Sequence, residues 1–194
     1  MIEGRLGPAQ TELADGSFWI LGGSGAAAST SEIFFDGLFV EGPSLDAIQA
    51  NSYLCASNIN EELTFVGAYT GYLYNWNLET FEDVSDGFEL DGFEAQCGTF
   101  TASDGTKKLI VAGGDPGVTR TQILDIETRT WREGPPLPFP IRLGRVFQDE
   151  NTFFIFGGYN TASFSQEKGE RKTLSSEKQF MFLIDVNSDA FCFS

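Results

Sequence analysis

The sequence predicts an all-β protein made of four repeats of a four-stranded antiparallel sheet, and three observations support this. Apolar residues fall in short clusters that end at glycine, such as Phe153-Phe154-Ile155-Phe156, and such clusters are typical of buried strands. The clusters recur at a nearly constant interval, which indicates a repeated structural unit. The 194 residues fit one all-β domain, and no apolar run approaches the roughly 20 residues that span a bilayer.

The inner strands of each repeat are marked by the small residues that end them. Gly22-Gly23, Gly67-Ala68, Gly113-Gly114 and Gly157-Gly158 each follow an apolar run, and their second residues are 45, 46 and 44 residues apart. We interpret Gly22-Gly23, Gly113-Gly114 and Gly157-Gly158 as strand-exit structure, because glycine tolerates positive φ and close backbone approach. The repeats cover approximately residues 1–47, 48–92, 93–138 and 139–194.

The outer strands of each repeat form a second pair joined by a turn. In the first repeat, Asp36-Gly37 between two apolar triplets predicts a type I′ hairpin. In the later repeats, six residues separate an apolar residue from an aromatic one. These pairs are Tyr74 and Phe81, Leu124 and Trp131, and Ile184 and Phe191. Each unit therefore contains four strands.

The chain resembles the kelch-repeat β-propeller family. The double glycine after an apolar strand, the six-residue gap before an aromatic residue and the run from Trp131 to Pro138 are all similar to kelch repeats. The resemblance implies kelch-type blades around a channel, as a small ring or as a segment of a larger propeller, since rings of about four to eight blades occur. It implies little about function. The departures from the pattern are Ala68, Leu124, Ile184, Phe39, Phe81 and Phe191.

Composition narrows the classes of function. The chain has no histidine, which removes Ser-His and Cys-His nucleophile pairs and nearly every metal site built around imidazole. The net charge of −16 argues against nucleic-acid binding, which needs a basic face. We expect a non-catalytic interaction module for a protein partner, with no cofactor, no metal and no membrane insertion. Alternatives are a structural or matrix component that assembles through blade edges and part of a larger propeller enzyme.

The charge is concentrated in the first half of the chain. Residues 1–106 hold seventeen acidic residues and one basic residue, whereas residues 107–194 hold eleven of each. One acidic stretch is either a solvated strand face, a docking surface for a basic partner or a weak calcium site. Its members are Glu79, Glu82, Asp83, Asp86, Glu89, Asp91 and Glu94.

A polar insertion of about sixteen residues separates the strand pairs of the fourth repeat. Long loops on a rigid scaffold often carry recognition residues, although insertions are also tolerated without function. The insertion and the acidic stretch are the two candidate partner-binding regions. Additional blades or another copy of the chain are further candidate partners, because either would complete the ring. The basic residues of the insertion are Lys168, Arg171, Lys172 and Lys178.

Three arginines and two cysteines complete the candidate residues. Arg5, Arg142 and Arg145 are expected to line the central channel, where arginines pair with carboxylates and carbonyls. Cys55 and Cys97 precede the glycine motifs of adjacent repeats, so they are expected on neighbouring inner strands. We expect buried free thiols first, and a disulfide if the protein matures in an oxidising compartment. A disulfide would need the two Cα atoms to lie within roughly 7 Å.

Overall fold

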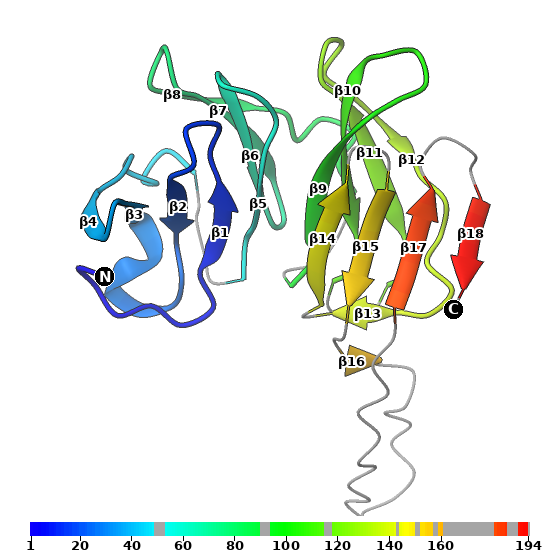
Figure 1. The fold of residues 1–194 in the computed structure, drawn as a ribbon, viewed down its shortest axis with the longest axis horizontal. Coiled ribbons are helices and arrows are strands. Elements are labelled where there is room, and N and C mark those ends of the chain that lie inside the picture. Colours follow the sequence, from blue (N-terminus) through cyan, green and yellow to red (C-terminus); the bar gives the residue numbers. More distant parts are fainter. Residues whose placement is uncertain are drawn as a thin grey trace, which may run out of the picture.

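Four antiparallel sheets follow one another along the chain, one from each repeat (Figure 1). In every sheet the strands are paired in chain order, as expected of successive hairpins. A computed structural model describes residues 1–48, 53–89, 94–114, 118–142, 144–149, 152–156, 159–160, 181–185 and 190–193. Within these ranges, no helix is long and apolar enough to cross a membrane.

The strand bounds agree with the expected four-stranded unit. The first sheet contains β1 (Ala9–Glu12), β2 (Phe18–Leu21), β3 (Ser31–Phe35) and β4 (Leu38–Glu41), with the 3-10 helix η1 (Gly25–Ser29) before β3. The second contains β5 (Cys55–Asn58), β6 (Leu63–Gly67), β7 (Gly71–Asn75) and β8 (Thr80–Asp83). The third contains β9 (Gln96–Thr101), β10 (Lys107–Ala112), β11 (Thr121–Asp125) and β12 (Thr130–Glu133).

The fourth sheet contains β14 (Arg145–Asp149), β15 (Thr152–Phe156), β17 (Met181–Asp185) and β18 (Ala190–Phe193). A short pair, β13 (Ile141–Arg142) and β16 (Tyr159–Asn160), forms a separate two-stranded sheet. The expected all-β class with four-stranded antiparallel sheets is therefore confirmed. The first strand of each sheet is innermost, and β1 contacts β5, β5 contacts β9, and β9 contacts β14.

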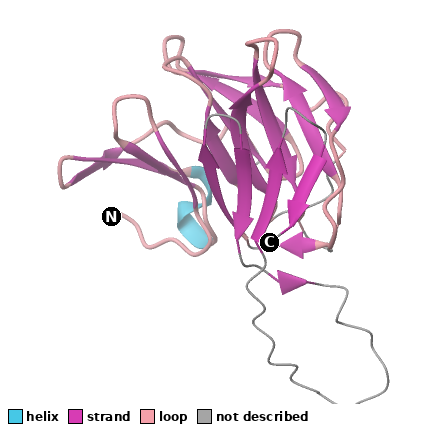
Figure 2. Cartoon of the chain, turned by 45° about the vertical axis from the view of Figure 1, so that its right-hand side comes forward, coloured by secondary structure: helices cyan, strands magenta, loops and turns pink. Residues whose placement is uncertain are grey.

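Neighbouring sheets follow one another side by side (Figure 2). Hydrogen bonds and apolar cores join them. The Thr11 hydroxyl accepts from the Asn58 N–H at 3.0 Å, and the Thr99 hydroxyl donates to the Asn58 carbonyl at 3.1 Å, so one residue links three inner strands. Trp19 and Val66 are buried between the first and second sheets. The sheets are therefore held face to face along the series by apolar packing.

Turn chemistry explains how the outer strands pair. Asp36 and Gly37 have φ of 48° and 79°, and they join Phe35 to its partner Leu38, so the predicted type I′ hairpin is confirmed. In the second and third sheets the longer turns begin with Asn75 and Asp125. Each of these side chains accepts two backbone N–H groups from the residues two and three positions later.

One part of the sequence alignment is wrong by one residue. Gly67 is the last residue of β6 and lies opposite Gly71, just as Ala112 ends β10 opposite Thr121. Gly67 is therefore a strand residue, whereas the alignment matched it with Gly22 and Gly113, which follow their strands. The shift of one residue arises from the length of the connection between the strands. Three residues join β6 to β7, whereas longer segments follow the glycine pairs of the first and third sheets. The six-residue spacing was the better guide to register, because Tyr74 does lie opposite Phe81.

Candidate functional site

The acidic stretch of the second repeat contributes to contacts between sheets. Glu82 pairs with Arg129 of the third sheet at 3.0 Å. Glu89 pairs at 2.7 Å with Arg120, which precedes β11. These carboxylates are thus neutralised within the chain, and their charges are less available to a partner than the sequence suggested. Such exposed pairs contribute little to stability, typically about 0–1 kcal/mol each.

The other members of this stretch have different surroundings. Glu79, Asp83 and Asp86 are exposed, and the Asp83 carboxylate accepts the Ser85 N–H at 2.8 Å. Glu94 is only 8% exposed and pairs with Arg142 at 3.5 Å. Burial therefore separates Glu94 from the exposed members of the stretch. Asp91 and the basic insertion residues Lys168, Arg171, Lys172 and Lys178 lie outside the described residues.

The three candidate arginines occupy different places. Arg142 is half-buried beside Glu94, which lines a central cavity. Arg145 begins β14, the innermost strand of the fourth sheet. The structure places Arg5 elsewhere, against the first sheet, where its side chain is 1% exposed and pairs with Glu32 at 3.0 Å. The sequence suggested the channel because it located these residues only by their distance from the glycine motifs.

The Arg5 guanidinium is held by backbone as well as by charge. It donates to the carbonyl oxygens of Gly22, Ala27 and Thr30 at 2.9, 3.0 and 2.8 Å. Burial raises the pKa of Glu32, but the N–H groups of Ile2 and Glu3 and the Arg5 guanidinium outweigh burial and hold that pKa below its usual value. Arg5 therefore has a structural role in the first sheet.

The innermost strands surround a cavity of about 760 Å³. Strands β1, β5 and β9 supply most of its lining, and Val146 of β14 also contributes. Its polar lining residues are Gln10, Thr11, Glu12, Tyr53, Ser57, Asn58, Glu94 and Gln96. The cavity is therefore lined by the first strands of successive sheets.

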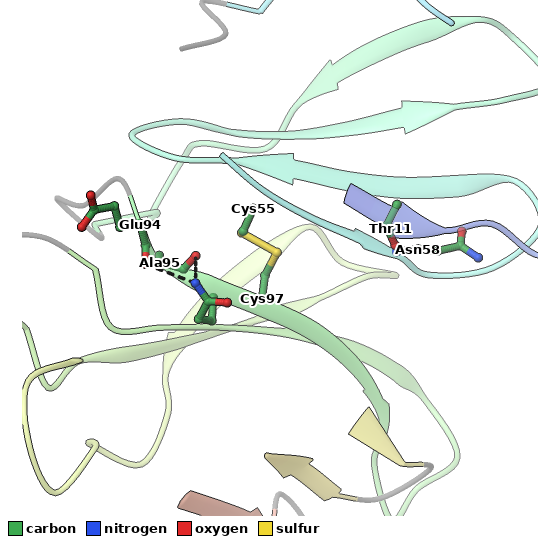
Figure 3. Close-up of a disulfide and its surroundings, with 7 residues drawn as sticks. Thr11, Cys55, Asn58, Glu94, Ala95 and Cys97 are labelled. Atoms are coloured by element: carbon green, nitrogen blue, oxygen red, sulfur yellow. Dashed lines mark hydrogen bonds between the residues drawn. A yellow bond between two sulfur atoms is a disulfide. The ribbon is translucent and has the colours of Figure 1, made fainter. Parts of the chain in front are cut away.

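Cys55 and Cys97 form a disulfide at the cavity wall (Figure 3). Their Cα atoms are 5.8 Å apart, within the 7 Å limit, and the bond joins β5 to β9. The expected placement on neighbouring inner strands is confirmed, whereas the preference for free thiols is wrong. The sequence placed the two cysteines, but their separation depends on how closely the second and third sheets approach at these positions.

A second hollow, of about 650 Å³, lies between the first and second sheets. We call it the intersheet groove. Its apolar side chains are Leu13, Ile33, Phe35 and Trp76, and its acidic side chains are Asp15 and Glu61. Phe35 is 57% exposed, so the groove presents an aromatic ring to solvent.

The acidic side chains of the intersheet groove are not neutralised by any basic residue in the part of the chain that the structure describes. Asp15, Glu61 and the adjacent Glu62 are exposed and take part in none of the ion pairs among the described residues. The Ser17 hydroxyl and N–H bond to Asp15 and lower its pKa, which favours the charged form. The groove could not be located from the sequence because its residues come from turns and strands of two repeats. The apolar triplets on both sides of the Asp36-Gly37 turn were the available signal.

Comparison with models of known protein families and with curated proteins found no match to this chain. Within the described ranges, no group of three or more Cys, Asp or Glu side chains is arranged to hold a metal ion. The candidate functional sites are therefore surface features, namely the intersheet groove, the central cavity and the charged side chains around them.

Proposed function

We propose that the chain is a non-catalytic protein-interaction module of the kelch-propeller type, and that its intersheet groove binds a basic segment of a protein partner. The observation that carries the proposal is the pairing of an exposed apolar floor with carboxylates that take part in no ion pair among the described residues. Exposed apolar surface with a polar rim is typical of interaction sites. The acidic rim selects partners that place Lys or Arg beside an apolar anchor, because complementary charge orients and accelerates association.

The charge distribution of the whole chain supports the same partner chemistry. The first 106 residues account for the full net charge of −16. Part of that charge is paired with arginines of the third sheet, as Glu82 and Glu89 are, but the groove carboxylates are not. A basic segment is therefore attracted by the first half of the molecule and held at the groove.

The first prediction concerns the groove carboxylates. The triple variant Asp15→Asn, Glu61→Gln, Glu62→Gln is expected to bind basic apolar peptides roughly 10-fold more weakly at low salt, since each rim charge contributes about 0.2–1 kcal/mol. The probes are fluorescent peptides with one leucine or phenylalanine anchor between Lys and Arg residues, and the measurement is fluorescence anisotropy. The loss should shrink at high salt, because screening removes the same contribution.

A matched variant controls for net charge. The control is a triple variant with Glu79→Gln, Asp86→Asn and Glu127→Gln, which removes three exposed carboxylates away from the groove. Its affinity for the basic peptides should change little. Versions of the peptides with Glu in place of Lys and Arg should not bind measurably. Equal affinity of the wild-type protein for the basic and acidic peptides, or equal losses in both triple variants, would show that the groove does not recognise basic segments.

A further inference from the structure

The outermost strands of the first three sheets can be aligned position by position. Each is paired with the third strand of its own sheet, and the register pairs that correspond are Phe34 with Phe39, Tyr74 with Phe81, and Leu124 with Trp131. The residues that correspond on either side of this aromatic position are Leu38, Thr80 and Thr130, and Val40, Glu82 and Arg132. The first sheet thus has apolar residues where the second and third sheets have polar or charged ones.

Leu38 and Val40 extend the intersheet groove over the outer part of the first sheet. They lie opposite Phe35 and Ile33, which line the groove, and residues directly opposite in an antiparallel pair project from the same face. Leu38 is 68% exposed and Val40 is 52% exposed. We call these four residues the outer strip.

The junction between the second and third sheets shows how the corresponding positions are used there. Glu82 pairs with Arg129 at 3.0 Å, and the Trp131 indole N–H donates to the carbonyl that follows β8. At the first junction, Val40 and Phe81 take the places of Glu82 and Trp131. Neither side chain can form these bonds, so the outer strip faces the first junction without the polar contacts that link the next two sheets.

β4 also presents backbone groups at the outer edge of the first sheet (Figure 1). The Gly42 N–H donates to the Ser31 carbonyl at 2.9 Å, and hydrogen-bonded pairs alternate along an antiparallel ladder. The N–H and C=O groups of Phe39 and Glu41 therefore point away from β3.

The side chains of β4 leave this edge open to a further strand. Charged side chains on an edge strand discourage the addition of another strand. Glu82 and Arg132 supply such charges on β8 and β12, whereas Val40 has the corresponding position on β4. Among the first three sheets, the edge of the first is therefore the one suited to strand addition.

The charges around the outer strip indicate a basic occupant. Asp36 precedes β4 and Glu41 ends it, and both are exposed. Neither takes part in the ion pairs formed by the described residues, and the same holds for Asp15 and Glu61 of the groove. A segment alongside β4 therefore meets a carboxylate at each end of the strand, which favours Lys or Arg at both of its ends.

We propose that the partner segment binds as an additional β-strand alongside β4, with apolar side chains at alternate positions over the outer strip and a basic residue on each side of them. This inference rests on the proposed function and specifies the conformation and residue pattern of the bound segment. Main-chain hydrogen bonds give affinity in strand addition, and alternate side chains give specificity. Leu38 and Val40 are two positions apart, a spacing that an extended segment matches and a helix does not.

The backbone test uses the wild-type protein. The probe is a short fluorescent peptide with valines at alternate positions, threonines between them and a lysine at each end. One version is N-methylated on two valines and another on two threonines, so that each blocks one edge of the extended peptide. One version should bind at least about 10-fold more weakly, because it cannot form the main-chain bonds, and the other should bind like the parent. By NMR, the Phe39 and Glu41 amides should exchange more slowly when the parent peptide is bound.

The side-chain test compares two double variants. Leu38→Thr with Val40→Thr removes the apolar groups, keeps residues that favour strands, and should weaken binding of the parent peptide roughly 10-fold. Ile2→Thr with Leu6→Thr makes the same kind of change at exposed residues outside the groove and should leave the affinity unchanged. The urea unfolding midpoints of both variants confirm that they are folded, and the backbone test requires no variant.

The outcomes separate this inference from the proposed function. Equal affinities of the two methylated peptides, unchanged exchange at Phe39 and Glu41, or equal losses in the two double variants would each overturn strand addition. If basic peptides with one anchor still bind more weakly to the Asp15, Glu61, Glu62 triple variant in that case, the groove recognises basic segments in another conformation. If that difference is absent as well, the proposed function fails together with strand addition.

Discussion

Replacing Arg5 with methionine should lower the free energy of unfolding by about 3–5 kcal/mol, the usual cost of leaving one member of a buried ion pair without its partner. The Arg5 side chain is 1% exposed and that of Glu32 is 2% exposed. The substitution also leaves the carbonyl oxygens of Gly22, Ala27 and Thr30 without this donor. Urea denaturation measures the loss, and the dependence of the unfolding free energy on urea concentration is compared between the variants.

Two further variants make the Arg5 result specific. Arg132→Met removes an exposed arginine whose guanidinium donates to the Glu133 carbonyl at 3.3 Å, and it should change stability by less than about 0.5 kcal/mol. The double variant Arg5→Met, Glu32→Gln should be more stable than the sum of the single losses predicts, because it removes the unpaired charge. Strict additivity would contradict a direct interaction between the two residues.

The same pair predicts how stability depends on pH. The pKa of Glu32 is lower in the folded protein than its usual value. The folded state therefore binds the proton less readily than the unfolded state, and the stabilisation is fully present above the ordinary pKa of 4.5 and lost as the pH falls through the lowered value. Arg5→Met should make the unfolding free energy less dependent on pH in this acidic range.

Reducing the Cys55–Cys97 disulfide should lower the free energy of unfolding by about 2–4 kcal/mol. The bond joins residues separated by 42 positions, so it removes a substantial loop-closure entropy from the unfolded chain. Because both cysteines lie at the cavity wall, reductant is expected to reach the bond in the folded protein. Urea denaturation with and without dithiothreitol measures the effect.

The control is the double variant Cys55→Ser, Cys97→Ser, which should have the stability of the reduced protein and show no response to dithiothreitol. The structure also predicts that reduction acts between the second and third sheets, since the bond connects β5 to β9. The hydrogen-exchange rates of the backbone amides in β5 and β9 should therefore rise on reduction. An unfolding midpoint unchanged by dithiothreitol would contradict a stabilising disulfide.

The sequence by itself determined the features that depend on neighbouring residues. Apolar clusters identified the strands, and the regular interval identified four repeats, because strand periodicity is encoded within a few residues. The Asp36-Gly37 hairpin was predicted correctly, since both residues accept positive φ at low cost. The neighbouring positions of Cys55 and Cys97 also followed from the repeat.

The tertiary structure decided which faces are covered and which charges are paired. Nothing in the sequence distinguishes Phe34 from its buried equivalent Leu124, because exposure depends on whether another sheet lies against that face. Likewise, Glu82 and Glu89 belong to one acidic stretch in the sequence, but arginines distant in the chain neutralise them. Burial and ion pairing are set by distances between sheets, and local sequence patterns do not contain those distances.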